Sequence, residues 1–198
     1  MAELTKGFAS EQSALVDDHR EMTWAELDSA VNKTVHALRG AGIGEGDTIS
    51  IVSGNRNEWF VMSLACAHAG ITFVPVNWHL VGPEIAYILE DSGSKAVVAD
   101  VRFVDEVARA LDDPRSAGIE LALVAGGPAT GRFGNFDEFV ATGSAEEPEN
   151  QSFGGPMFYT SGTTGNPKGV RSSLSAMEPG TTPEVWHLIG AGFADMVR

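Results

Sequence analysis

The chain has 198 residues, of which 43% are hydrophobic and 20% are charged, as is typical of a soluble globular protein with one or two domains. Acidic residues outnumber basic residues by 27 to 13, and the resulting net charge of −14 argues against nucleic acid or an anionic membrane as the partner. The single cysteine, Cys66, excludes an internal disulfide and fits a reducing compartment, so we expect a cytoplasmic protein.

The first predicted element is a short strand over residues 14–16, which ends at the turn Asp17-Asp18. Thr23 and Glu26 then have the spacing of a capping box, and apolar side chains recur behind them at helical intervals. An amphipathic helix is therefore expected here, and it should end in a group of glycines: Gly40, Gly42 and Gly44.

Strands and helices alternate over the next hundred residues. The apolar pattern predicts strands over residues 48–52, 71–76, 95–99 and 119–125. Helices are predicted over residues 57–69 before Gly70, from Pro83 onward, and over residues 102–111 with Asp100 as the cap. This alternation indicates an α/β fold with a mainly parallel sheet flanked by helices, whose nearly all-apolar strands fit a sheet covered on both faces.

One uncharged stretch, from Trp59 to Pro83, has the length of a membrane span. Gly70, Pro75 and Asn77 interrupt it, so we expect a buried helix followed by a buried strand, and no integral membrane segment. The polar residues 142–155 are expected to form a solvated connection. The histidines lack metal-ligand spacing and are expected at the surface or in the core: His19, His36, His68, His79 and His187.

The most informative stretch runs from Tyr159 to Gly169. It follows a short apolar run over residues 156–159 that has the size of a buried strand, and a second strand is expected over residues 168–172. It alternates hydroxyl side chains with glycines, which let backbone N–H groups turn toward a ligand. Lys168 adds one positive charge, and no Asp or Glu occurs from Asn150 to Met177. A nest of N–H groups with hydroxyls and an ammonium group favours phosphate oxygens.

This stretch has two other interpretations. Its composition also fits an ordinary flexible loop rich in glycine, serine and threonine. A Walker A loop, G-x-x-x-x-G-K-S/T, is excluded because a register that starts at Gly162 requires glycine at Pro167 and a hydroxyl residue at Gly169.

Residues 159–169 resemble the signature loop of the adenylate-forming enzymes, which include acyl-CoA synthetases, aryl-CoA ligases, luciferases and peptide-synthetase adenylation domains. Every fixed position of that loop is met. The resemblance implies that the loop binds the β- and γ-phosphates of ATP and the departing pyrophosphate, that Lys168 neutralises developing charge, and that Thr160 is a Mg²⁺ ligand. The implied ATP-binding residues are Thr160, Ser161, Gly162, Thr163, Thr164, Gly165, Asn166, Pro167 and Lys168.

Upstream segments extend the resemblance over about residues 27–171. Gly46-Asp47, Val74-Pro75-Val76-Asn77 and the helix pattern from Glu84 to Ser92 follow the family's structural motifs. The resemblance implies ATP-dependent activation of a carboxylic acid, a fatty or related acid, to an acyl-adenylate, followed by transfer to coenzyme A. The alternatives are an aryl-CoA ligase, a peptide-synthetase adenylation domain, or a catalytically silent nucleotide-binding fragment.

Family members are more than twice this length, and their downstream motifs are not found in this sequence, which stops within a helix predicted from Thr182. We therefore interpret residues 1–198 as a partial N-terminal AMP-binding domain that lacks the rest of that domain and the C-terminal domain. We expect such a piece to be inactive alone and prone to self-association, because a sheet cut before its last strands leaves an unpaired edge and uncovered apolar faces.

Overall fold

The structure of the protein, a computed structural model, describes residues 9–160 and 166–171. The strands are β1 Ser13–Val16, β2 Glu21–Thr23, β3 Thr48–Val52, β4 Thr72–Val76, β5 Ala96–Asp100, β6 Leu121–Ala125, β7 Gly134–Asn135, β8 Met157–Thr160 and β9 Lys168–Arg171. The helices are α2 Trp24–Gly40, α3 Asn57–Ala69, α4 Gly82–Asp91, α5 Val104–Asp112 and α6 Phe136–Ala141, with 3₁₀ turns at Val101–Phe103 and Pro114–Ser116.

The centre of the fold is a five-stranded parallel sheet with the strand order β4-β3-β5-β6-β7. The pairing of β3 with β4 runs in register from Thr48 opposite Thr72 to Val52 opposite Val76. All residues of β3 and β5 are buried, which explains why these strands are mostly apolar. The predicted parallel α/β sheet is thus confirmed, and two antiparallel hairpins, β1–β2 and β8–β9, are added to it.

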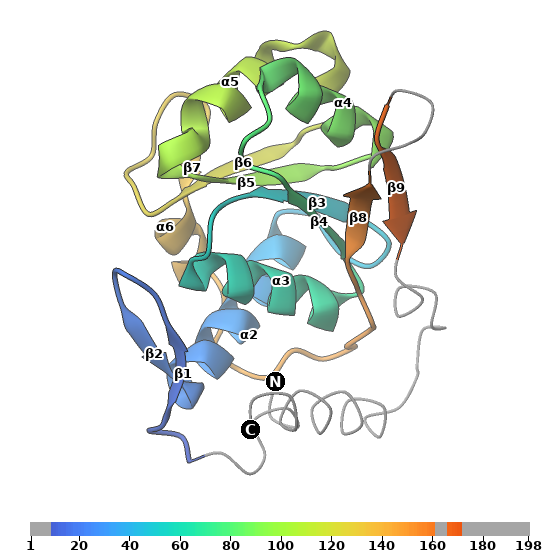
Figure 1. The fold of residues 1–198 in the computed structure, drawn as a ribbon. Coiled ribbons are helices and arrows are strands. Elements are labelled where there is room, and N and C mark those ends of the chain that lie inside the picture. Colours follow the sequence, from blue (N-terminus) through green and yellow to red (C-terminus); the bar gives the residue numbers. More distant parts are fainter. Residues whose placement is uncertain (1–8, 161–165, 172–198) are drawn as a thin grey trace.

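Helices cover both faces of the sheet, with α4 and α5 on one side and α2, α3 and α6 on the other (Figure 1). Side chains of β5 alternate between the two layers. Ala96 and Val98 join the core beneath α2 and α3, whereas Val97 and Ala99 join the core beneath α4 and α5. The sheet therefore separates two hydrophobic cores.

Local sequence signals account for several element boundaries. At the start of α2, the Thr23 hydroxyl accepts a hydrogen bond from the Glu26 amide at 3.2 Å, and the Thr23 amide donates to the Glu26 carboxylate at 2.8 Å. This is the predicted capping box. Helix α3 ends at Gly70, whose φ of 71° is the left-handed conformation that glycine adopts without strain.

Some expectations differ from the structure. Asp100 caps the 3₁₀ turn at Val101–Phe103 rather than the α-helix that follows, because its carboxylate accepts from the Arg102 amide at 3.0 Å. Strands β2 and β7 and helix α6 were not predicted, since they are too short to produce a clear apolar period. The connection before β8 is solvated only in its first part, because Gly154 and Gly155 are buried.

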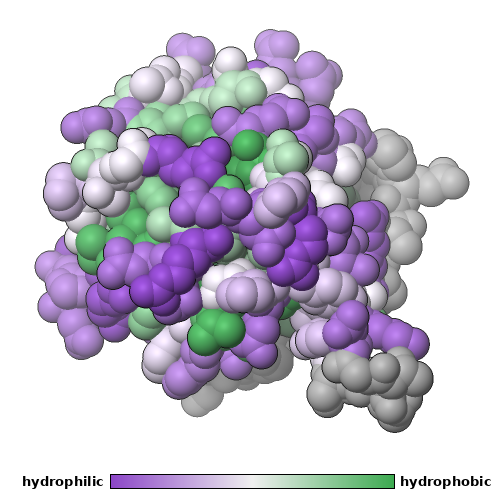
Figure 2. Space-filling model, turned by 90° about the horizontal axis from the view of Figure 1, so that it is seen from above, coloured by the Kyte–Doolittle hydropathy of each residue, from purple (hydrophilic) through white to green (hydrophobic). Residues whose placement is uncertain are grey.

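The uncharged stretch that has the length of a membrane span contains most of α3 and all of β4, the expected helix followed by a strand. No helix in the described part of the chain is long and apolar enough to cross a membrane. Cys66 lies on α3 and is completely buried, and burial raises the pKa of its thiol, which agrees with a packing role. Seen from the side of α4 and α5, the surface is mainly hydrophilic with small hydrophobic patches (Figure 2).

Candidate functional site

The β8–β9 hairpin carries both ends of the loop that the sequence predicts to bind phosphate. Tyr159 pairs with Gly169, and Thr160 pairs with Lys168, the last pair before the loop. Four predicted site residues are described: Thr160, Asn166, Pro167 and Lys168. The others lie outside the described residues: Ser161, Gly162, Thr163, Thr164 and Gly165.

The two faces of the hairpin differ in character. Met157 and Tyr159 point toward the core beneath α4 and α5, so the alternation of side chains places Phe158 and Thr160 on the opposite face. Their cross-strand partners Val170 and Lys168 share that outer face. It therefore carries an apolar pair, with Phe158 and Val170 exposed by 52% and 53%, next to the polar pair at the base of the loop.

Gly169 leaves room for the side chains on the inner face. A Cβ atom at this position would clash with the end of Met157 and would lie 3.2 Å from Cζ of Tyr159. The absence of a side chain lets the Tyr159 ring lie across the facing strand. This glycine of the signature segment therefore has a structural role on β9, separate from the contacts of the loop.

The hairpin is fixed against the main sheet at the β4 edge (Figure 1). The Phe73 amide of β4 donates to the Gly155 carbonyl at 3.1 Å, and the Gly154 amide donates to the Ala67 carbonyl at 2.9 Å. A Cβ at Gly154 would overlap backbone oxygens of Cys66 and Ile71. The segment before β8 therefore lies directly against the end of α3 and the start of β4.

Helix α4 contacts both strands of the hairpin. The Tyr159 hydroxyl donates to Asp91 Oδ2 at 2.6 Å, and the Tyr87 hydroxyl donates to the Pro167 carbonyl at 3.0 Å. Burial, followed by the Asp91 carboxylate, raises the pKa of both tyrosines. The fold thus places the Asp91 carboxylate beside Tyr159, which lies within residues 150–177, where the sequence contains no Asp or Glu. Sequence reasoning missed this contact.

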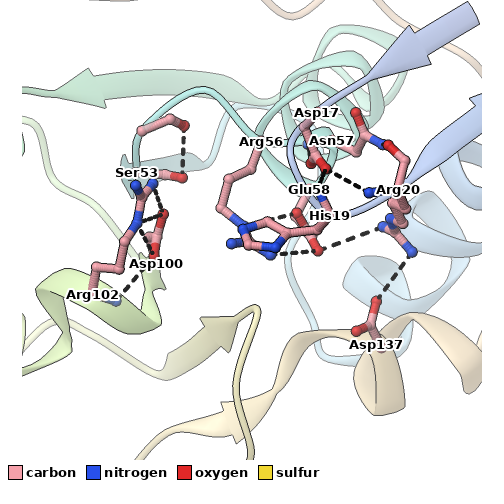
Figure 3. Close-up of polar contacts among 11 residues, drawn as sticks. Asp17, His19, Arg20, Ser53, Arg56, Asn57, Glu58, Asp100, Arg102 and Asp137 are labelled. Carbon is pink, nitrogen blue, oxygen red and sulfur yellow. Dashed lines mark hydrogen bonds and ion pairs between the residues drawn. The ribbon is translucent and has the colours of Figure 1, made fainter.

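A second polar cluster lies where β3 and β5 end, at the edge of the sheet where open α/β folds often bind ligands (Figure 3). Asp100 is fully buried and accepts from Nε and Nη2 of Arg102 at 3.1 and 2.6 Å. Burial alone would raise the pKa of Asp100, but the Arg102 hydrogen bonds hold it below its usual value. The charges in this pair compensate one another.

The same cluster ties the β1–β2 hairpin to α3. Asp17 accepts from the Asn57 amide at 2.8 Å, and Glu58 lies 3.1 Å from Arg56 and 3.6 Å from Arg20 (Figure 3). The charges of Arg20, Arg56 and Glu58 are thus paired within the protein, and the Asp17 carboxylate accepts hydrogen bonds from backbone amides. The arrangement links the hairpin to the helix. No group of three or more His, Cys, Asp or Glu side chains that could hold a metal occurs among residues 9–160 and 166–171.

Comparisons with known proteins agree with this geometry. Residues 5–182 match the model of the AMP-binding enzyme family. The fatty acid–[acyl-carrier-protein] ligase ScoC of Streptomyces coeruleorubidus is 30% identical over 79% of this chain, and the long-chain-fatty-acid–CoA ligase FadD13 of Mycobacterium tuberculosis is 33% identical over 75%. The chain spans only 29% of the length of either relative.

Solved structures give the same result for the fold. A putative long-chain-fatty-acid CoA ligase from Rhodopseudomonas palustris superimposes with a TM-score of 0.72 and 26% identity. The match covers 85% of this chain and 42% of that one. The described elements therefore correspond to one part of a considerably longer protein chain in these relatives.

Proposed function

This chain belongs to the AMP-binding enzyme family, and we propose that it is the N-terminal part of an acid–thiol ligase that activates a carboxylic acid with ATP. In the first step the carboxylate attacks the α-phosphorus of ATP, which gives an acyl-adenylate and releases pyrophosphate. In the second step the thiol of coenzyme A displaces AMP and forms the thioester. Residues 1–198 contribute the phosphate loop to the first step, and the remaining sites belong to downstream sequence.

The observation that carries this proposal is the pairing of Thr160 with Lys168 at the base of a loop rich in glycine and hydroxyl groups. Both residues are exposed, and they leave the same face of the hairpin. A hydroxyl and an ammonium group are thus available on either side of the loop entrance. Hydroxyl and N–H donors with one ammonium group are the chemistry that phosphate oxygens require.

We assign Lys168 to the stabilisation of charge that develops on the leaving pyrophosphate. Its position on a hydrogen-bonded strand limits the region that the ammonium group can reach. The exposed Thr160 hydroxyl suits Mg²⁺, which takes oxygen ligands and usually keeps phosphate and water oxygens around few protein groups. A bound Mg²⁺ would neutralise phosphate charge during the transfer.

A fatty or related acid is the proposed substrate, since both relatives described above are named as fatty acid ligases. Coenzyme A is the proposed acceptor, as in the printed name of FadD13. The lone buried Cys66 and the acidic composition fit a cytoplasmic enzyme that binds neither nucleic acid nor an anionic membrane.

Acid-dependent exchange between pyrophosphate and ATP tests the proposal. The assay is run on the full-length enzyme that contains this sequence, with panels of fatty, aryl and amino acids. Lys168→Ala is expected to lower the exchange rate about a hundredfold, because one removed charge-stabilising donor costs about 3 kcal/mol in the transition state. If exchange occurs only with aryl acids or only with amino acids, those acids are the substrates and the fatty acid assignment is wrong. If no acid supports exchange, acid activation is refuted.

A further inference from the structure

Helix α4 is linked by side-chain hydrogen bonds to both ends of the phosphate loop. Tyr159, whose hydroxyl donates to Asp91, immediately precedes Thr160. Pro167, whose carbonyl accepts from Tyr87, immediately precedes Lys168. Tyr87 and Asp91 are four residues apart on α4 and share one face of the helix. One helix face therefore holds the chain just before and just after the loop.

Helix α4 is itself fixed against the sheet. Ile85, Ile88 and Leu89 are almost completely buried in the core between α4, α5 and the sheet. At its N-terminus, the Gly82 amide donates to Glu106 of α5 at 2.9 Å. Helix α4 is therefore held in place by the core and by α5, and it supports the inner face of the hairpin. The outer face of the hairpin is exposed.

We propose that Tyr87 and Asp91 are positioning residues that hold the two ends of the phosphate loop and thereby raise its affinity for pyrophosphate and ATP. The inference rests on the function proposed above. When the strands that carry Thr160 and Lys168 are already fixed, less conformational entropy is lost on binding phosphate, so the affinity is higher than with untethered strands. The two residues act on affinity through Thr160 and Lys168 without contacting phosphate.

The chain offers matched variants for a test. Tyr87→Phe removes only the hydroxyl that bonds Pro167, and Asp91→Ala removes the acceptor of Tyr159. Asp91→Asn keeps an acceptor oxygen and loses the charge, so it should rescue the defect of Asp91→Ala. Glu90→Gln is the control, because it removes the adjacent negative charge from the exposed side of the same helix.

Binding of Mg·ATP and of pyrophosphate to residues 1–198 is measured by calorimetry for each variant. Tyr87→Phe and Asp91→Ala are each expected to weaken binding about fivefold, the effect of one neutral hydrogen bond. Asp91→Asn and Glu90→Gln should bind within about twofold of the wild type. Amide hydrogen exchange across Met157–Thr160 and Lys168–Arg171 should accelerate only in the two weakened variants.

A spectroscopic label on the tyrosine rings reports directly on these contacts, because Tyr87 and Tyr159 are the only tyrosines in the sequence. Tyr87→Phe leaves a single ring signal, and that signal should move when pyrophosphate is added. Unchanged affinity in both Tyr87→Phe and Asp91→Ala would overturn the inference while the proposed function stands. Faster amide exchange without weaker binding would overturn it as well. A wild type that binds no phosphate ligand would refute the phosphate role of the loop, whereas pyrophosphate–ATP exchange by the full-length enzyme tests the proposed function separately.

Discussion

Thr160 and Lys168 face each other across the β8–β9 hairpin, at the last pair before the loop. Directly paired residues of an antiparallel hairpin have Cβ atoms about 5 Å apart on one face. Backbone pairing therefore places side by side the bases of the two side chains that the sequence predicts to act on phosphate. Their spacing does not depend on the length or path of the loop.

The approach of β8 to the main sheet depends on Gly154. Gly154→Ala is expected to destabilise the protein by about 3 kcal/mol, because the new methyl group would overlap backbone oxygens of Cys66 and Ile71 that cannot move independently. Urea denaturation followed by circular dichroism measures this change. Gly40→Ala is the matched control, since nothing lies within 4 Å of the added methyl group and alanine favours the helix. Equal stability of both variants would contradict the packing described for β8.

The cluster at the end of β3 depends on a buried ion pair. Arg56 and Glu58 side chains are only 7% and 5% exposed, so Glu58→Ala would leave the guanidinium group buried without its nearest partner. We expect a loss of about 3 kcal/mol in the free energy of unfolding. Asp112→Ala, which removes an 83% exposed carboxylate 4.0 Å from Arg132, should change stability by less than about 0.5 kcal/mol. A loss for Glu58→Ala as small as that for Asp112→Ala would disprove the assigned role.

His68 is expected to make stability depend on pH. Burial lowers the pKa of this imidazole from 6.5 to about 4. As the pH falls below 6.5, the unfolded chain binds a proton that the folded protein does not accept until about pH 4, so unfolding becomes easier. The contribution between pH 7 and pH 5 is about 2 kcal/mol. His68→Gln should flatten this part of the stability profile, and an unchanged slope in the variant would show that His68 does not titrate as described.

The outer face of the hairpin is expected to drive self-association of residues 1–198. Phe158 and Val170 form an exposed apolar pair, and β9 pairs only with β8 among the described residues. Sedimentation velocity should show concentration-dependent association. The double variant Phe158→Ser and Val170→Thr should reduce it, because less apolar surface is exposed. A wild type that remains monomeric at high concentration would refute this prediction.

The sequence predicts the alternating elements well, since their signals are local. The apolar run of β3, the capping box at Thr23 and the stop at Gly70 each depend on residues close in the chain. Helix α6 and the buried end of the connection at Gly154 depend instead on packing between distant segments, so no local pattern indicates them. The predicted start of a last helix at Thr182 and His187 lie outside the described residues.

The same distinction applies to the candidate site. The motif from Tyr159 to Gly169 identifies the loop from its own residues, and the strands on either side were expected. The contacts with Tyr87 and Asp91 join residues 80 and 68 positions apart, and only the fold brings them together. Sequence reasoning could therefore name the groups that we propose to bind phosphate, but it could not find the helix that contacts both strands beside the loop.

Titration of pyrophosphate and Mg²⁺ into residues 1–198 and into Lys168→Ala tests most directly whether this hairpin carries a phosphate site. The Lys168 side chain is exposed, so its removal should change the free energy of unfolding by less than about 0.5 kcal/mol. We predict that the wild type binds pyrophosphate and that Lys168→Ala binds at least about tenfold more weakly, as expected for the loss of a charge-assisted contact. Equal binding by two equally stable proteins, or no binding by either, would contradict the assignment of this loop and of Lys168 to phosphate.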